Sequence, residues 1–169
     1  MPDLIIAGVH IPIEALGDHN QSYDDEAAGG TATLTLADGS QITQTRYRKL
    51  TTTLAASGWV PPGLPTLVPG APVVLSCVGR LAVGGASRVI TLPAARRGDA
   101  PLIGQATVAG RMVATAVESV VGHVATLAAV PGASSYAALY YPEFLAHVTI
   151  TRDVDVGQGF GWRLTAREA

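Results

Sequence analysis

Nineteen glycines and eleven prolines interrupt this chain of 169 residues at short intervals, and they limit its fold more than any other feature. Proline fixes φ and lacks a backbone N–H, and glycine inside a helix costs conformational entropy, so long helices are disfavoured. Between these breaks stand short runs in which polar and apolar residues alternate, drawing on eighteen valines and sixteen threonines. Alternation of β-branched residues is typical of half-buried strands. The sequence therefore predicts a mostly β fold.

The predicted architecture is one domain over residues 1–169, a β-barrel or β-sandwich built of hairpins with at most one or two short helices. The length suits a single domain with a sizeable core. The chain shows no fixed-period repeat, and no linker long enough to separate domains.

Asp38-Gly39 is the strongest hairpin signal, because alternating residues flank it at 31–36 and 41–47. We expect a type I′ turn there, with positive φ at both central residues. A second hairpin is expected over residues 79–92, with its turn at Gly84-Gly85.

Other segments are predicted with less detail. Residues 4–11 are expected to form one strand that ends at Pro12, and residues 17–26 a polar loop. Residues 119–127 fit either a strand or a short helix, since periodicity does not separate the two. Further strands are expected at 72–78, on both sides of Ala109-Gly110, at 147–151 and at 160–165.

The charge pattern argues against nucleic acid as a partner. The formal net charge is −2, and charged residues make up only 14% of the chain. The basic cluster Arg46-Tyr47-Arg48-Lys49 is better explained as a solvated strand edge than as a nucleic-acid site. A chain with so little charge is expected to cover part of its surface with other protein chains.

Nothing in the sequence predicts a membrane partner. Met1-Pro2-Asp3 has no positively charged signal region, and the least polar stretch, residues 112–130, is broken by Glu118 and His123. We therefore expect synthesis in the cytoplasm. Cys77, the single cysteine, lies in an apolar run and is expected to be a buried small hydrophobe.

No catalytic, metal-binding or cofactor-binding residue is predicted. The four histidines match no ligand spacing, and no nucleophile elbow or phosphate loop occurs. Asp18, Asp24, Asp25 and Glu26 could supply oxygen ligands, but their spacing fits no EF-hand and a solvated loop is the better explanation. A small hydrolase that pairs His19 with Asp24 or Asp25 is a rival hypothesis.

The loop at residues 58–65 is the predicted assembly interface, formed by Trp59, Pro61, Pro62 and Leu64. Prolines keep such a loop stiff, so little entropy is lost when a partner docks, and tryptophan often dominates contact energetics. Alternatively, Trp59 fills its own core. A third alternative is a β-sandwich that binds carbohydrate or a host surface, with Trp59 and Tyr140 as aromatic platforms. Trp162, like Trp59, could also be a sugar platform, but a core or interface role is the commoner case for tryptophan.

Four stretches of the chain resemble small tail proteins of tailed bacteriophages. They are Gln21-Ser22-Tyr23 before Gly29-Gly30, Leu36-Ala37-Asp38-Gly39 to Gln44-Thr45, Lys49-Leu50 through Gly63-Leu64, and Tyr140-Tyr141-Pro142 with the closing segment 161–168. Residues 80–139 carry no part of this likeness. The resemblance implies a structural, non-enzymatic component of the virion tail or baseplate, with other tail proteins and copies of itself in a symmetric ring or tube as partners.

Overall fold

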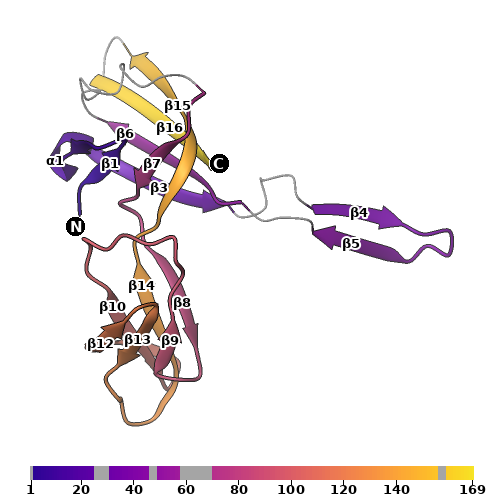
Figure 1. Cartoon of the computed structure of the whole chain (residues 1–169), viewed down its shortest axis with the longest axis vertical. Coiled ribbons are helices and arrows are strands. Elements are labelled where there is room, and N and C mark those ends of the chain that lie inside the picture. The colour runs from indigo at the N-terminus through magenta and orange to yellow at the C-terminus, as the bar shows by residue number, and fades with distance from the viewer. Residues whose placement is uncertain (1, 25–30, 46–48, 58–69, 156–158) are drawn as a thin grey trace. The chain divides into compact units, whose positions relative to one another are not determined.

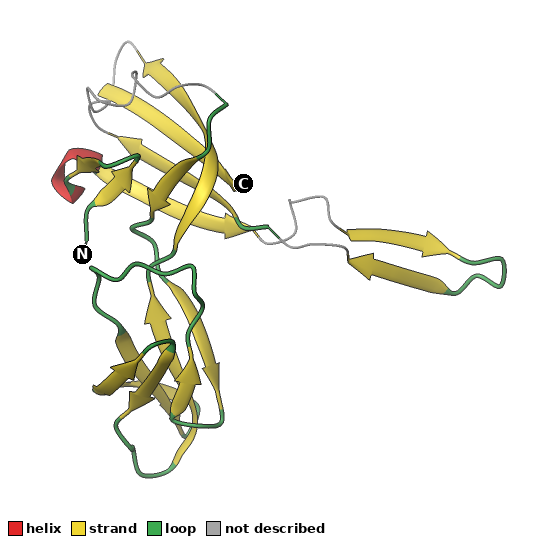
Figure 2. Ribbon diagram, viewed as in Figure 1, coloured by secondary structure: helices red, strands yellow, loops and turns green. Residues whose placement is uncertain are grey.

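The computed structural model describes residues 2–24, 31–45, 49–57, 70–155 and 159–169, and the regular secondary structure within these ranges is almost entirely strand (Figures 1 and 2). The one helix among these described residues, α1 (Ile13–Leu16), has four residues. The predicted mostly β fold with at most one or two short helices is confirmed. No helix in these ranges is long and apolar enough to cross a membrane.

The described residues form two compact units. The central unit comprises Ser76–Phe144 with the N-terminal Pro2, and the terminal unit comprises Asp3–Leu75 and Leu145–Ala169. This division does not test whether the chain unfolds as the single domain predicted for residues 1–169, so that stays a prediction.

The terminal unit is organised around a seven-stranded sheet in the order β2-β1-β7-β15-β16-β6-β3. Its strands are β1 (Leu4–Ile6), β2 (Val9–Ile11), β3 (Asp18–Asp24), β6 (Thr51–Ser57), β7 (Val73–Ser76), β15 (Glu143–Asp155) and β16 (Gly159–Glu168). Along β16, Trp162, Leu164 and Ala166 are buried while the residues between them are exposed or half-buried. This period of two places one face of the sheet on the core.

The central unit contains two smaller sheets. The first has the order β11-β10-β14-β8, and the second has the order β12-β13-β9. Their strands are β8 (Leu81–Gly85), β9 (Val89–Thr91), β10 (Ile103–Val108), β11 (Arg111–Thr115), β12 (Val117–Val121), β13 (Val124–Leu127) and β14 (Ala133–Tyr140). Ala138 of the first sheet shares one buried cluster with Ile90, Ala125 and Leu127 of the second. The inner faces of the two sheets thus pack together as in a β-sandwich.

The Asp38-Gly39 hairpin is confirmed, but its turn type is not. Strands β4 (Thr31–Thr35) and β5 (Gln41–Thr45) pair in a two-stranded sheet, here called the ribbon. Of the two central residues, only Gly39 has a positive φ, of 82°. Its N–H donates to the Leu36 carbonyl at 2.9 Å. The loop therefore has three residues, with a glycine closing a β-turn, rather than the predicted two-residue type I′ turn.

Positive φ at both central residues occurs instead at two Ala-Gly pairs. Ala7 and Gly8 have φ of 52° and 80°, and Ala109 and Gly110 have 49° and 76°. The first pair turns residues 4–11 into the β1–β2 hairpin, so the single strand predicted there is wrong. The second pair joins β10 to β11, which confirms the strands predicted on its two sides.

The hairpin predicted over residues 79–92 is wrong. Strands form on both sides of the expected turn, but β8 pairs with β14 and β9 pairs with β13. Gly84 lies within β8, at a position where a Cβ would collide with the carbonyl oxygen of Tyr136, so glycine is needed there. This glycine therefore permits close strand approach rather than a turn. Residues 119–127, left open by periodicity, form most of the β12–β13 hairpin.

The polar loop predicted at residues 17–26 is also wrong in its described part, because Asp18–Asp24 forms β3 at the edge of the seven-stranded sheet. A strand this polar is stable because its half-buried side chains find partners. Gln21 Nε2 donates to Thr52 Oγ1 at 2.9 Å, and Thr52 Oγ1 donates to the Ser22 carbonyl at 2.8 Å. Satisfied hydrogen bonds remove the cost of burying these groups.

Candidate functional site

The predicted assembly residues Trp59, Pro61, Pro62 and Leu64 lie outside the described residues, as do Asp25, Glu26 and Arg46–Arg48. The loop therefore stays a prediction. The candidate surfaces that can be built from described residues are two hollows, the ribbon, and one hairpin tip in the central unit.

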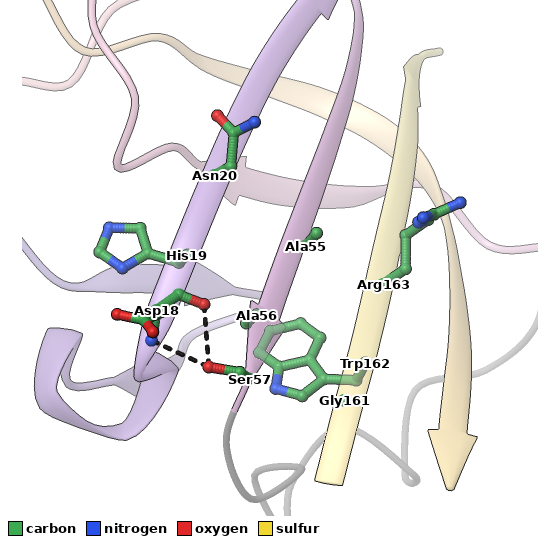
Figure 3. Close-up of a pocket in the computed structure, with 9 residues that line it drawn as sticks. All are labelled: Asp18, His19, Asn20, Ala55, Ala56, Ser57, Gly161, Trp162 and Arg163. Atoms are coloured by element: carbon green, nitrogen blue, oxygen red, sulfur yellow. Dashed lines mark hydrogen bonds between the residues drawn. The ribbon is translucent and has the colours of Figure 1, made fainter. Parts of the chain in front are cut away.

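The first hollow lies at one end of the terminal-unit sheet, where β3, β6 and β16 run side by side (Figure 3). It has a volume of about 400 Å³ and is lined by Asp18, His19, Asn20, Ala55, Ala56, Ser57, Gly161, Trp162 and Arg163. The Ser57 hydroxyl accepts a hydrogen bond from the Asp18 N–H at 3.0 Å and lies 3.2 Å from the Asp18 carbonyl, to which it donates (Figure 3). Both contacts go to backbone, so this hydroxyl joins two strands.

The hydrolase hypothesis gains no support from this hollow. His19 Nδ1 lies 3.1 Å from the Gly17 carbonyl, and Asp24 stands five residues further along the same strand. Five residues of strand span roughly 16 Å, and an odd separation places the two side chains on opposite faces. The structure thus does not bring His19 and Asp24 together.

The described residues also give no support to the metal-binding and carbohydrate-binding alternatives. In the described part of the chain, no three His, Cys, Asp or Glu side chains are grouped so that they could hold an ion. Trp162 is only 2% exposed and Tyr140 is 9% exposed, so neither presents a ring face on which a sugar could stack. Trp162 is a core residue, and its Nε1 has no hydrogen-bond partner among the described residues.

The second hollow belongs to the central unit and has a volume of about 470 Å³. Arg80 stands at its wall with its guanidinium carbon 5.9 Å from the centre of the Tyr141 ring, a cation–π distance. Asp99, also in the wall, is held by Arg97 through hydrogen bonds of 2.9 and 2.6 Å. Asp99 and Arg97 neutralise each other, so the charged group of this wall that pairs with no described carboxylate is the Arg80 guanidinium.

Arg97 is a buried structural cation. Its side chain is 1% exposed, and its Nη1 donates to the Cys77 carbonyl at 3.1 Å. The hydrogen bonds to Asp99 raise the pKa of Arg97 above its ordinary value, which outweighs the opposite effect of burial. Cys77 is buried, as predicted. The group ties the segment after β9 to the start of the central unit.

The ribbon has one polar and one apolar side. Thr33 and Thr43 face each other across the strands with hydroxyls 3.4 Å apart. On the other side, Leu34 lies opposite Ile42, with Leu36 two residues beyond Leu34. These three side chains, the ribbon face, are 54%, 44% and 43% exposed, and no third strand joins the sheet in the described ranges. An isolated two-stranded hairpin is marginally stable in water, so the ribbon face favours a covering partner.

Asp38 places a charge at the ribbon's turn. Its carboxylate accepts hydrogen bonds from the Ser40 hydroxyl at 2.7 Å and the Ser40 N–H at 2.9 Å. The hydroxyl contact, followed by the backbone contact, lowers the pKa of Asp38 below its ordinary value. The turn therefore carries a negative charge at neutral pH.

A second exposed apolar surface is the tip of the β12–β13 hairpin in the central unit. Val121 and Val124, here called the valine tip, lie opposite each other on one face of the hairpin and are 75% and 39% exposed. Arg96 supports the turn between these strands, since its Nη2 donates to the Gly122 carbonyl at 2.9 Å. An apolar surface thus lies beside a guanidinium.

Sequence reasoning located the ribbon as a hairpin but did not identify it as a candidate surface. The alternation of Thr with Ala and Leu in residues 31–36 was the available signal, because it predicts one apolar side. The valine tip could not be found, since residues 119–127 admitted both helix and strand. No protein-family model matches this chain, and a comparison with curated proteins finds no relative.

Proposed function

We propose that the protein is a structural subunit that assembles with copies of itself into a symmetric ring or tube, as a component of a bacteriophage tail or baseplate. The observation that carries the assembly is the ribbon face. Three large apolar side chains lie exposed on a two-stranded sheet, so in a single chain their burial adds little to stability. Covering them with another subunit supplies the burial that the ribbon lacks.

The tail or baseplate assignment rests on the resemblance of the four stretches quoted above. The first includes Gln21 and Tyr23 of β3, and the second includes the turn and return strand of the ribbon. The low charge content supports the same role, because a subunit surrounded by neighbours needs little solvated surface. In this proposal the protein has no catalytic role and needs no cofactor.

The assembly is tested with the purified full chain by sedimentation velocity over a range of concentrations and by negative-stain electron microscopy. We expect discrete closed or stacked oligomers. The paired variant L34Q/I42Q should remain monomeric, because it makes the ribbon face polar. The matched control T33Q/T43Q alters the opposite side of the same strands and should assemble as the wild type does. A wild-type chain that stays monomeric throughout refutes the assembly.

The virion assignment is tested separately. Antibodies against the folded chain should label one end or the length of the tail in phage particles that contain it. Label confined to the soluble fraction of the cells, with none on particles, contradicts a virion role. The carbohydrate-binding alternative is not favoured by any described aromatic surface, since Trp162 and Tyr140 are buried.

A further inference from the structure

Formal charge is divided unevenly between the two compact units. The central unit holds five Arg and three acidic residues, a formal charge of +2. The rest of the chain holds six basic and ten acidic residues, a formal charge of −4, and the two values make up the −2 of the whole protein. Two terminal units in contact would repel each other, whereas the terminal unit of one copy attracts the central unit of the next.

The same complementarity occurs locally at the two exposed apolar surfaces. The ribbon face lies beside the Asp38 carboxylate, which is the one charged group of residues 31–45. The valine tip lies beside Arg96, which donates a hydrogen bond to the neutral Gly122 carbonyl. No carboxylate forms an ion pair with Arg96 in the described part of the chain. Each copy thus carries one apolar surface with an acid and one with a base.

We infer that the ribbon face of one copy docks on the valine tip of the next copy, with the turn of the first beside Arg96 of the second. This inference rests on the assembly proposed above and names the two surfaces that form it. The contact is heterologous, so each copy offers a free ribbon face and a free valine tip until a ring closes or a tube grows. The occupant of both surfaces is therefore another copy of this chain.

A mixing experiment tests the pairing, with two full-length variants that each lack one surface. L34Q/I42Q loses the ribbon face, and V121Q/V124Q loses the valine tip. All four positions are at least 39% exposed, so both variants should fold. Alone, each should remain monomeric at concentrations at which the wild type assembles, because loss of one surface raises the concentration needed by about tenfold or more. Mixed in equal amounts, they should form a complex of one chain of each kind and nothing larger, because one intact contact remains.

Two controls keep the result specific. T33Q/T43Q changes the polar side of the ribbon, and M112Q changes an apolar side chain of β11 that is 77% exposed but lies outside the valine tip. Both should assemble like the wild type. If the wild type assembles but the mixed variants form no one-to-one complex, or if V121Q/V124Q alone assembles normally, the inference is overturned while the proposed function stands. If the wild type does not assemble, the proposed function is refuted, and the inference that rests on it is refuted as well.

Discussion

The central and terminal units bury their apolar side chains in different ways. The terminal unit rests one seven-stranded sheet on large residues, of which Trp162, Leu54 and Leu164 are almost fully buried. The central unit closes two small sheets on each other, and its buried cluster combines Ile90, Leu92 and Leu127 with Ala125 and Ala138. Two facing sheets interdigitate their side chains in one layer, so that layer has little room for added volume.

This difference predicts opposite sensitivities. The terminal unit should suffer most from loss of side-chain volume, because few other residues can fill the space that Trp162 leaves. The central unit should suffer most from added volume, because its strands already approach closely at Gly84 and Gly104. The substitutions below test this contrast in order of expected effect.

Trp162→Ala should be the most damaging change, with a loss of about 3–5 kcal/mol in the free energy of unfolding of the terminal unit. Val74→Ala, at a position of the same unit that is 49% exposed, should cost less than about 0.5 kcal/mol. Hydrogen exchange in denaturant measures both units at once. If amides of the central unit lose protection together with those of the terminal unit, residues 1–169 unfold as the single domain that the sequence predicts.

Gly104→Ala should destabilise the central unit by about 1–3 kcal/mol. The new Cβ would stand 2.6 Å from the Thr115 carbonyl oxygen and 2.9 Å from Leu127 Cδ2, and the backbone oxygen cannot move without breaking the β10–β11 ladder. Gly98→Ala is the control, since its Cβ would meet no atom within 4 Å. Equal midpoints of chemical denaturation for the two variants would show that the sheets are not closely packed at Gly104.

Gly39→Val acts on the ribbon, which belongs to neither core. A β-branched residue resists the φ of 82° found there, at a cost of about 1–2 kcal/mol. Gly39→Asn should cost less, because asparagine tolerates this region better. Amide exchange at Leu34 and Ile42, a hydrogen-bonded pair of the ribbon, should accelerate while both units keep their protection. Slowed assembly of the same variant would connect ribbon order to the proposed contact.

Ala109→Gly and Ala7→Gly form a matched pair, one in each unit, with the smallest expected effect. Both alanines have positive φ, so glycine relieves strain but adds freedom to the unfolded chain. The net gain should be about 0.5 kcal/mol in the unit that carries the substitution. Thermal unfolding followed unit by unit checks this, and a loss at either site would mean that the alanine methyl group contributes packing that outweighs the strain.

How far the sequence predicts the candidate surfaces is shown by two hairpins. For the ribbon, Asp38-Gly39 and the alternating residues on both sides located the strands. The same alternation also predicts which residues share the apolar side. For the valine tip, Val-rich residues 117–127 lacked an alternating pattern, so the hairpin emerged only in the structure. The predicted assembly loop at Trp59 lies outside the described residues and stays a prediction.

The sequence by itself determined where most strands and turns occur, because glycine, proline and β-branched residues act through local backbone sterics. Tertiary structure decided which strands pair. It separated β8 from β9 and gave each a partner far along the chain, because a strand's backbone can pair with any edge and the core selects among them. It also made a strand of the polar residues 18–24, since Thr52 supplies hydrogen bonds that no local pattern reveals. Strand formation is a local property of this chain, and strand partnership is a property of its packing.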